Sequence, residues 1–200
     1  MKPKLKTYLA GPINHKNPEA FAYSKKWREY IAVELKAMNI ESLDPLKRTG
    51  GDSITPELRV NLRAACAEED LETIHKIVGD VIIPPDLEMV KQSHFITLYL
   101  PIRENSSFDL FELKKLCESL NDSISFEDDR KIMDYIHNNI YEICGTYGEA
   151  TLAKYLNIPV YLITQRENKN IPEWLIGCCN DVFNSWDAYL LRIFNEYHSR

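Results

Sequence analysis

The sequence has no apolar run as long as a membrane span, which needs about 18 apolar residues in a row. It also has no cluster of lysine and arginine of the kind that neutralises nucleic-acid phosphates. The amino-terminal stretch reaches Gly11-Pro12 before the apolar run of a signal peptide can develop. With 27% charged residues and a net charge of −6, we expect a soluble, cytoplasmic protein that binds neither nucleic acid nor membrane.

Cysteine and histidine are too few and too scattered to form a metal site. The five cysteines are odd in number, and none shows the paired spacing of a zinc site. The adjacent Cys178 and Cys179 cannot easily form one unstrained disulfide. We therefore expect reduced thiols, no metal and no cofactor.

The sequence does have enough apolar residues for a core, and short apolar runs alternate with amphipathic stretches. Two hundred residues, 44% of them apolar, suit a single domain over residues 1–200. Strands are predicted at residues 4–10, 40–43, 95–100 and 160–163. The last two lack polar alternation, as expected where helices cover both faces of a parallel sheet. The fold class predicted is α/β, a doubly wound parallel sheet of the flavodoxin-like or Rossmann-like kind.

Helix signals separate these strands. Asn17, Pro18 and Glu19 predict the start of a helix after the first strand, and Asn39 predicts its end. The buried stripe expected for this helix is Trp27, Ile31, Leu35 and Met38. A further helix is predicted from Glu57 to about Ile77.

Three breaks are predicted in the remaining chain. Residues 46–56 are rich in turn formers and predict a loop that serves as a lid. Gly79 and Pro84-Pro85 are expected to end the preceding helix, and Pro85-Asp86 to open a brief new one. Residues 102–144 predict an inserted helical hairpin. The tail predicts a loop at 165–172, a last strand before Phe183 and a closing helix whose buried side is Trp186, Leu190 and Phe194.

Polar and flexible residues follow the predicted strands. Because right-handed crossovers collect the loops that follow parallel strands at one edge of the sheet, these residues are expected to converge there. They are Tyr8, Gly11, Pro12, Ile13, Asn14, Asp44, Asp86, Gly145, Thr146 and Glu149.

Glu149 lies in the stretch CGTYGEATLAKYLNIPVYLI at 144–163, which predicts a helix ending at Asn157 and then a strand. Two interpretations compete for this glutamate, which is expected in the first helical turn. In one, Thr146 is the N-cap of a capping box and Glu149 satisfies a backbone N–H. In the other, Glu149 is a nucleophilic or basic carboxylate at the mouth of the sheet.

Four sequence blocks, taken in their order, resemble a known family. They are YLAGPI at 8–13, DP at 44–45, PDLEMVKQSHFITLYL at 85–100 and GTYGEATLAKYLNIPV at 145–160. Together they resemble the nucleoside 2-deoxyribosyltransferase-like family, which includes deoxyribosyltransferases and nucleoside 5′-monophosphate N-glycosidases. The resemblance spans most of residues 4–164 and leaves the segment 102–144 outside its pattern.

The resemblance implies roles for several residues. Glu149 is implied to be the nucleophile that attacks C1′ of the sugar, and Asp86 to hold the sugar hydroxyls or assist proton transfer to the base. Tyr8 would hydrogen-bond the glutamate or the ribose. The turns at Gly11 and Gly145 would let backbone N–H groups approach sugar or phosphate. The substrate-binding set is Gly11, Pro12, Ile13, Asn14, Asp44, Gly145 and Thr146.

These residue types suit cleavage of an N-glycosidic bond. Positive charge develops at C1′, and a carboxylate stabilises that charge or bonds to the carbon. The departing base needs a proton, and two carboxyl groups in different surroundings can divide the two roles. The sequence predicts N-glycosidic cleavage or transfer on a deoxynucleoside or its 5′-monophosphate, a small-molecule substrate.

Several alternatives stay open at this level. Ser93-His94 replaces an acidic residue common in the family, and no basic phosphate clamp follows the first strand, so nucleoside and nucleotide both remain candidates. Asp44 suits a turn former, Asp86 an N-cap and Tyr8 a core aromatic. A nucleotide-binding sensor without turnover is the alternative function. Family members often complete the pocket with a neighbouring subunit, so a homo-oligomer is expected.

Overall fold

The computed structural model describes residues 4–13, 18–48, 51–52, 55–101, 144–166 and 171–198. The strands are β1 (Leu5–Ala10), β2 (Ile40–Leu43), β3 (Lys47–Arg48), β4 (Gly51–Asp52), β5 (Phe95–Tyr99), β6 (Val160–Ile163) and β7 (Asp181–Phe183). The helices are α1 (Pro18–Ala37), α2 (Pro56–Ala67), α3 (Leu71–His75), the π-helix η1 (Lys76–Ile82), α4 (Ile83–Gln92), α7 (Cys144–Tyr155), α8 (Glu173–Cys178) and α9 (Trp186–His198).

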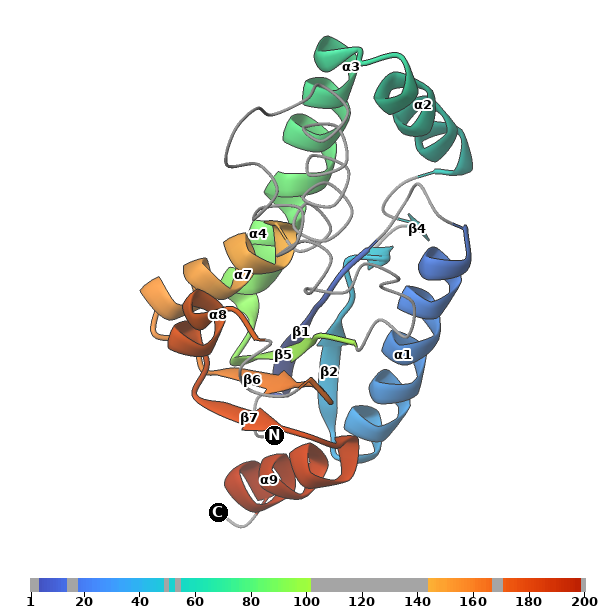
Figure 1. Ribbon diagram of the computed structural model, residues 1–200. Helices are drawn as coiled ribbons and strands as arrows, with labels where there is room; N and C mark the ends of the chain where they lie inside the picture. The colour runs from blue at the N-terminus through green and yellow to red at the C-terminus, as the bar shows by residue number, and fades with distance from the viewer. Residues whose placement is uncertain are drawn as a thin grey trace, which may run out of the picture.

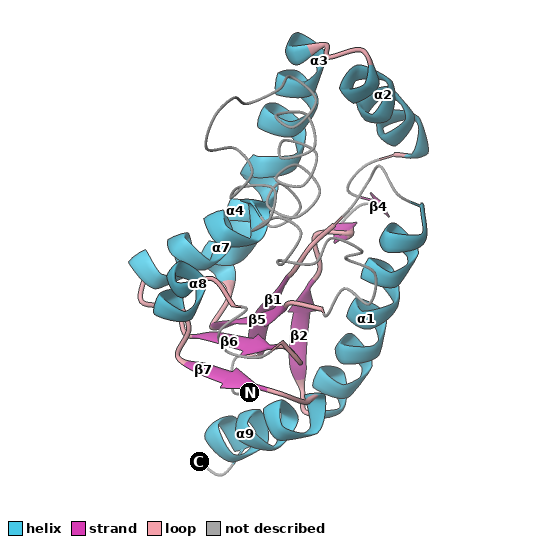
Figure 2. Ribbon diagram, viewed as in Figure 1, coloured by secondary structure: helices cyan, strands magenta, loops and turns pink. Residues whose placement is uncertain are grey.

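The main sheet has five strands in the order β2-β1-β5-β6-β7. All four pairings are parallel, with Tyr8 opposite Ile96 and Ile96 opposite Val160. This is the strand order of flavodoxin-like folds. In these folds the order in which the chain adds strands reverses between two adjacent central strands, which are β1 and β5 here. The predicted doubly wound parallel sheet is confirmed (Figures 1 and 2).

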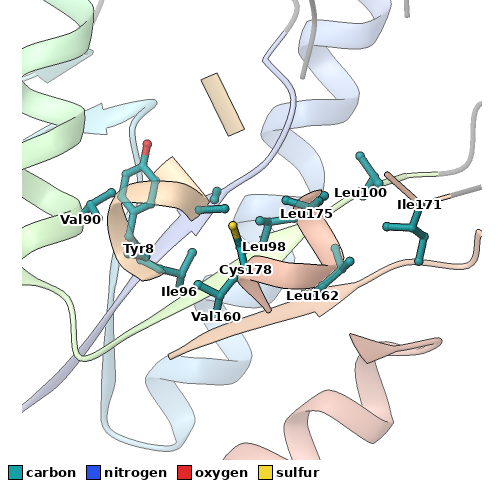
Figure 3. Packing of buried hydrophobic residues seen from close by; sticks show 13 residues of the cluster. Tyr8, Val90, Ile96, Leu98, Leu100, Val160, Leu162, Ile171, Leu175 and Cys178 are labelled. Atoms are coloured by element: carbon teal, nitrogen blue, oxygen red, sulfur yellow. The ribbon is translucent and has the colours of Figure 1, made fainter. Parts of the chain in front are cut away.

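Helices cover both faces of this sheet (Figure 1). On one face, α4, α7 and α8 pack on a core that includes Tyr8, Ile96 and Leu162. On the other face, α1 and α9 pack on a second core that includes Leu9, Phe95 and Ile163. Figure 3 shows the first core, with the Tyr8 hydroxyl at its outer end and pointing away from Ile96 and Val160.

The predicted limits of the helix between β1 and β2 are confirmed. The helix starts at Pro18, and Asn39 beyond its end takes a left-handed conformation with φ 58°. Trp27, Ile31 and Leu35 are buried along one side, as the spacing predicts. An apolar stripe at helical spacing thus fixes which side of α1 faces the sheet.

The predicted loop at 46–56 contains regular structure. Lys47 pairs with Asp52 in the short antiparallel ladder β3-β4, and Thr55 then caps α2 by accepting a hydrogen bond from the Leu58 backbone N–H at 3.1 Å. Lys47–Arg48 and Gly51–Asp52 are therefore strand residues, and the prediction of a loop is wrong for these residues.

The predicted helix from Glu57 to Ile77, and the predicted break after it, are both wrong. α2 ends at Ala67, and Glu69 leaves the helix with φ 56°. Asp70 caps the next helix through a hydrogen bond from the Thr73 backbone N–H at 3.1 Å. From there α3, η1 and α4 follow one another without a gap from residue 71 to 92.

The proline pair 84–85 lies inside this continuous helix instead of starting a new one. A proline in a helix interior lacks an N–H and crowds the carbonyl one turn earlier. The π-helix η1 lies directly before the pair, and the Ile83 backbone N–H donates to the Val78 carbonyl five residues back. The wider π turn relieves the crowding and lets the helix pass through both prolines.

The tail matches the prediction in its elements and differs in detail. A last strand, β7, and a closing helix, α9, are both present. Tyr189, Leu190 and Ile193 are the buried residues of α9, while Phe194, expected inside, is 48% exposed. The helix is rotated toward the aromatic side chains of β6 and β7, since Tyr189 packs on both Tyr161 and Phe183.

Some expectations fall on other parts of the chain. The helical hairpin predicted at 102–144 lies outside the described residues apart from Cys144, and Asn14 lies outside them too. Cys66, Cys178 and Cys179 are free thiols. None of the helices in the described ranges is both long and apolar enough to cross a membrane.

Candidate active site

A hydrogen bond joins Tyr8 of β1 to Glu149 of α7. The Tyr8 hydroxyl donates to Oε1 of Glu149 at 2.6 Å, although the two residues are 141 positions apart in the sequence. Tyr8 is fully buried and belongs to the core under α4 and α7, while Glu149 is partly buried. β1 is one of the two strands at which the sheet order reverses, where ligands of open α/β sheets bind.

Glu149 does not form the capping box. α7 includes Cys144 and has no acidic residue in its first turn, so Thr146 lies within the helix and is not its N-cap. Thr146, Ala150 and Ala153 are all buried, which extends the apolar stripe of the helix back through the glycines. Glu149 therefore has no capping role, and its Oε1 accepts the Tyr8 hydrogen bond instead.

The surroundings of Glu149 favour its protonated form. Burial raises the pKa of Glu149 to about 8, and the negative charge of Asp86 adds to the rise. The Tyr8 hydrogen bond and the positive charge of Arg28 oppose it. Burial also raises the pKa of Tyr8 well above its ordinary value, so Tyr8 stays a hydrogen-bond donor.

Asp86 lies in α4, and its charge acts on both Tyr8 and Glu149. The N-cap interpretation of Asp86 is wrong because the residues before it are already helical and leave no free helix end there. The structure thus brings the three predicted catalytic residues within electrostatic reach of one another.

The turn after β1 is tightly held. Gly11 is buried, and a Cβ added there would come within 2.8 Å of the Tyr99 carbonyl oxygen and 2.9 Å of the Trp27 ring. The Gly11 carbonyl accepts a hydrogen bond from Arg28 at 2.8 Å, and the Pro12 carbonyl accepts one from Ser24 at 2.6 Å. Glycine is required at position 11 because the backbone passes so close to its neighbours.

Arg28 was not expected at the site from the sequence. It comes from α1, is fully buried, and has Asp44 beside it at 3.6 Å. The signal that could have found it is its spacing: residues 24, 28, 31 and 35 follow the stripe of α1 that faces the sheet, and all four are buried. A charged residue on such a stripe is rarely buried without partners.

Asp44 is 6% exposed at the end of β2. Its Oδ1 accepts a hydrogen bond from the Leu46 backbone N–H at 2.9 Å, which confirms the turn-forming interpretation. Burial raises the pKa of Asp44, while the Leu46 hydrogen bond and Arg28 oppose that rise. Contact of Asp44 with substrate stays a prediction that its burial disfavours.

Gly145 and Thr146 fall at the start of α7. Gly145 is exposed, and no described atom lies within 4 Å of the place where its Cβ would be. Thr146 is 3% exposed and so faces the core. No described residue therefore blocks a ligand from reaching Gly145, whereas the Thr146 side chain is buried and out of reach. Both substrate contacts stay predictions.

Two surface depressions in the described part of the chain lie elsewhere. They have volumes of about 350 and 240 Å³, share Thr164 and Asn184, and sit at the carboxyl ends of β6 and β7. Neither is lined by Tyr8, Asp86 or Glu149. We place the candidate site at Tyr8 and Glu149, because a carboxyl group with a raised pKa indicates chemistry more directly than a shallow hollow does. The described residues contain no group of three or more His, Cys, Asp or Glu that could hold a metal ion.

Comparison with known proteins gives a fold and no family. No family model matches the sequence, and no curated protein matches it. A solved 2-deoxyribosyltransferase from Bacillus psychrosaccharolyticus superposes with a TM-score of 0.51 at 16% identity, covering 92% of this chain and 90% of that chain. The chain shares the fold of a 2-deoxyribosyltransferase. A conserved protein from Enterococcus faecalis V583 is similar at a TM-score of 0.48 and 14% identity over 97% of this chain and 99% of that chain, too low to add weight.

Proposed function

We propose that the protein breaks the N-glycosidic bond of a deoxynucleoside or a deoxynucleoside 5′-monophosphate, with Glu149 as the nucleophile. The observation that carries this proposal is the 2.6 Å hydrogen bond from Tyr8 to Glu149, with the charge of Asp86 acting on both. It lies at the strand reversal of a deoxyribosyltransferase fold, and it joins two of the sequence blocks that resemble that family.

The proposed first step forms one bond and breaks another. A carboxylate oxygen of Glu149 bonds to C1′ while the bond from C1′ to the base nitrogen breaks, and the base leaves with a proton. Tyr8 holds Oε1 of Glu149, which leaves Oε2 for the attack. In the second step, water or another base takes the sugar from Glu149, giving hydrolysis or transfer.

The proton for the base comes from the carboxyl pair. Because burial raises the pKa of Glu149 to about 8, its carboxyl carries a proton at neutral pH, and the Asp86 carboxylate, whose charge acts on Glu149, can accept that proton. When that proton lies on Asp86, Glu149 is ionised and Asp86 can protonate the base. A carboxylate out of bulk water also interacts strongly with the positive charge that develops at C1′.

The test is release of free base from each deoxynucleoside and each deoxynucleoside 5′-monophosphate, with and without an acceptor base. We expect release by the wild type and a loss of about 1000-fold or more in Glu149→Ala, the scale of losing a nucleophile. Glu173→Ala is the matched control, since Glu173 is also a helical glutamate, but it is exposed and is not part of the candidate site. Release only with acceptor identifies transfer. A Glu149→Ala variant with the wild-type rate contradicts the proposal.

One observation favours a second candidate, a nucleotide-binding sensor without turnover. A Glu149 carboxyl with a pKa of about 8 is mostly protonated at neutral pH, and a protonated carboxyl binds a sugar hydroxyl without attacking carbon. The melting temperature separates the two functions: a sensor shows a ligand-dependent rise and no free base. Free base in the same sample excludes the sensor.

A further inference from the structure

Arg28 holds the turn after β1 from the side of α1. Its Nη2 donates to the Gly11 carbonyl at 2.8 Å, and its Nη1 donates to the Ser24 hydroxyl at 2.6 Å and the Ser24 carbonyl at 3.0 Å. The Ser24 hydroxyl in turn donates to the Pro12 carbonyl at 2.6 Å. Both carbonyls of the turn therefore accept a hydrogen bond from a side chain of α1: the Gly11 carbonyl from Arg28 and the Pro12 carbonyl from Ser24.

This arrangement fixes the direction of the next backbone N–H. The peptide bonds of the described residues are all trans, and in a trans peptide the C=O and N–H point in opposite directions. Since the Pro12 carbonyl points toward Ser24, the Ile13 N–H points away from it. Arg28 and Ser24 thus orient a donor at the end of the strand that carries Tyr8.

A buried arginine whose only task is to neutralise Asp44 would be placed differently. The planar guanidinium suits two parallel hydrogen bonds to one carboxylate. Here the Arg28 Nε is 3.6 Å from the Asp44 Oδ1 and makes no hydrogen bond, while the other two nitrogens bind the turn and Ser24. The orientation of the Arg28 guanidinium therefore suits hydrogen bonds to the turn and to Ser24, and Asp44 balances only part of its charge.

The remaining charge reaches the candidate site. The titratable groups whose charges act on one another there are Tyr8 from β1, Arg28 from α1, Asp86 from α4 and Glu149 from α7. Arg28 is the one cation among them, and its charge acts on Tyr8 and on Glu149. Its ring contact is Trp27, with the guanidinium carbon 4.2 Å from the ring centroid.

We propose that Arg28 is a positioning residue, which fixes the Gly11–Pro12 turn at the end of β1 and supplies a fixed positive charge to the Tyr8–Glu149 pair. It touches neither reacting carboxyl group and acts through the turn and through its charge. Its catalytic consequence rests on the proposed function, but its effect on the ionisation of Glu149 does not.

The test is a carboxyl titration that needs no turnover. Protein labelled with ¹³C at the glutamate side-chain carboxyl is titrated by NMR, and Glu149→Gln identifies the Glu149 signal. In Arg28→Gln we expect the Glu149 midpoint to rise by about one pH unit, because the charge is lost.

Asp44→Asn is the matched control. It disturbs the same buried ion pair from the other side and leaves the Arg28 charge in place, so we expect no rise in the Glu149 midpoint. An equal rise in Arg28→Gln and Asp44→Asn would show a merely structural effect and overturn the proposal. An unmoved midpoint in Arg28→Gln overturns it as well.

A second variant covers the case in which Arg28→Gln does not fold. The double variant Arg28→Gln/Asp44→Asn removes both charges, and a neutral pair is tolerated better than one unpaired buried charge. We expect the rise of about one unit to persist in it relative to Asp44→Asn. If base release is measurable, the pH profile of kcat/KM should move by the same amount. If the wild type releases no free base, the proposed function is wrong, but the proposal for Arg28 is still tested by the NMR titration.

Discussion

At the scale of single residues, the Tyr8 and Glu149 side chains form the contact on which the proposed function depends. The sequence blocks predicted that they would be neighbours, because each follows or lies in a strand of one parallel sheet. Arg28 could not be predicted in the same way, because an arginine on a helix is usually solvated. Its burial depends on the Gly11 carbonyl and Asp44, which only the folded sheet brings beside it.

The raised pKa of Glu149 makes stability depend on pH. The pKa of this group is 4.5 in its ordinary state and about 8 in the folded protein, so between these values the folded state binds more protons than the unfolded state. Stability is then lost as pH rises through this window. We expect the wild type to lose free energy of unfolding relative to Glu149→Gln from pH 5 to 8, by at most about 1.4 kcal/mol per pH unit and less if solvent reaches the carboxyl.

Urea unfolding of both proteins at pH 5, 6.5 and 8 measures this difference. Glu173→Gln controls for loss of an exposed carboxyl and should show no pH-dependent difference from wild type. Parallel stability curves for wild type and Glu149→Gln would show that the Glu149 pKa is ordinary.

Tyr8→Phe removes the hydrogen bond and keeps the ring in the core. The hydroxyl lowers the pKa of Glu149, so its loss should raise the Glu149 midpoint above that of the wild type. We expect stability to fall by about 1 kcal/mol, the usual net value of one hydrogen bond. The carboxyl NMR titration measures the midpoint, and a midpoint that falls would mean that Tyr8 does not donate to Glu149.

At the scale of elements, helix signals gave the right limits for α1 and the wrong ones for the segment 57–92. Pro18 and Asn39 are local signals, and the limits of α1 agree with both. The proline pair 84–85 is a local signal that the π-helix η1 overrides. Propensity alone cannot foresee this, because it assumes a helix with one regular turn. Asp86 changes its interpretation as a result, from a helix cap to a charged group of the candidate site.

The turn after β1 offers a test of close packing. Gly11→Ala would bring a Cβ within 2.8 Å of a backbone oxygen, and backbone cannot move aside easily. We expect this variant to lose about 1–3 kcal/mol of stability. Gly148→Ala in α7 has no described atom within 4 Å of its Cβ, and it should gain up to about 1 kcal/mol from helix propensity. Chemical denaturation compares them, and equal effects would contradict the close approach at Gly11.

At the scale of the whole molecule, the fold class was predictable and the assembly was not. The alternation of strands and helices fixes a parallel sheet with two covered faces, and the strand order and both cores agree with it. The hairpin expected at 102–144 stays a prediction. A homo-oligomer remains a proposal, which light scattering coupled to size-exclusion chromatography would decide.

The candidate site draws on β1, α4 and α7, so its electrostatics require the complete fold. In urea, we expect the Glu149 carboxyl titration to return from about 8 toward its ordinary 4.5 in the same transition in which the near-UV circular dichroism is lost. A return at lower urea than global unfolding would mean that α7 leaves the sheet as a separate unit.

The most direct measurement is the mass of the protein after acid quenching of a reaction with its substrate, followed by peptide mapping. We expect an adduct of one deoxyribosyl group, or its 5′-phosphate, on the peptide that contains Glu149, and no adduct in Glu149→Gln. Base release with an adduct on another residue, or at an unchanged rate in Glu149→Gln, would contradict the assignment of Glu149 as the nucleophile.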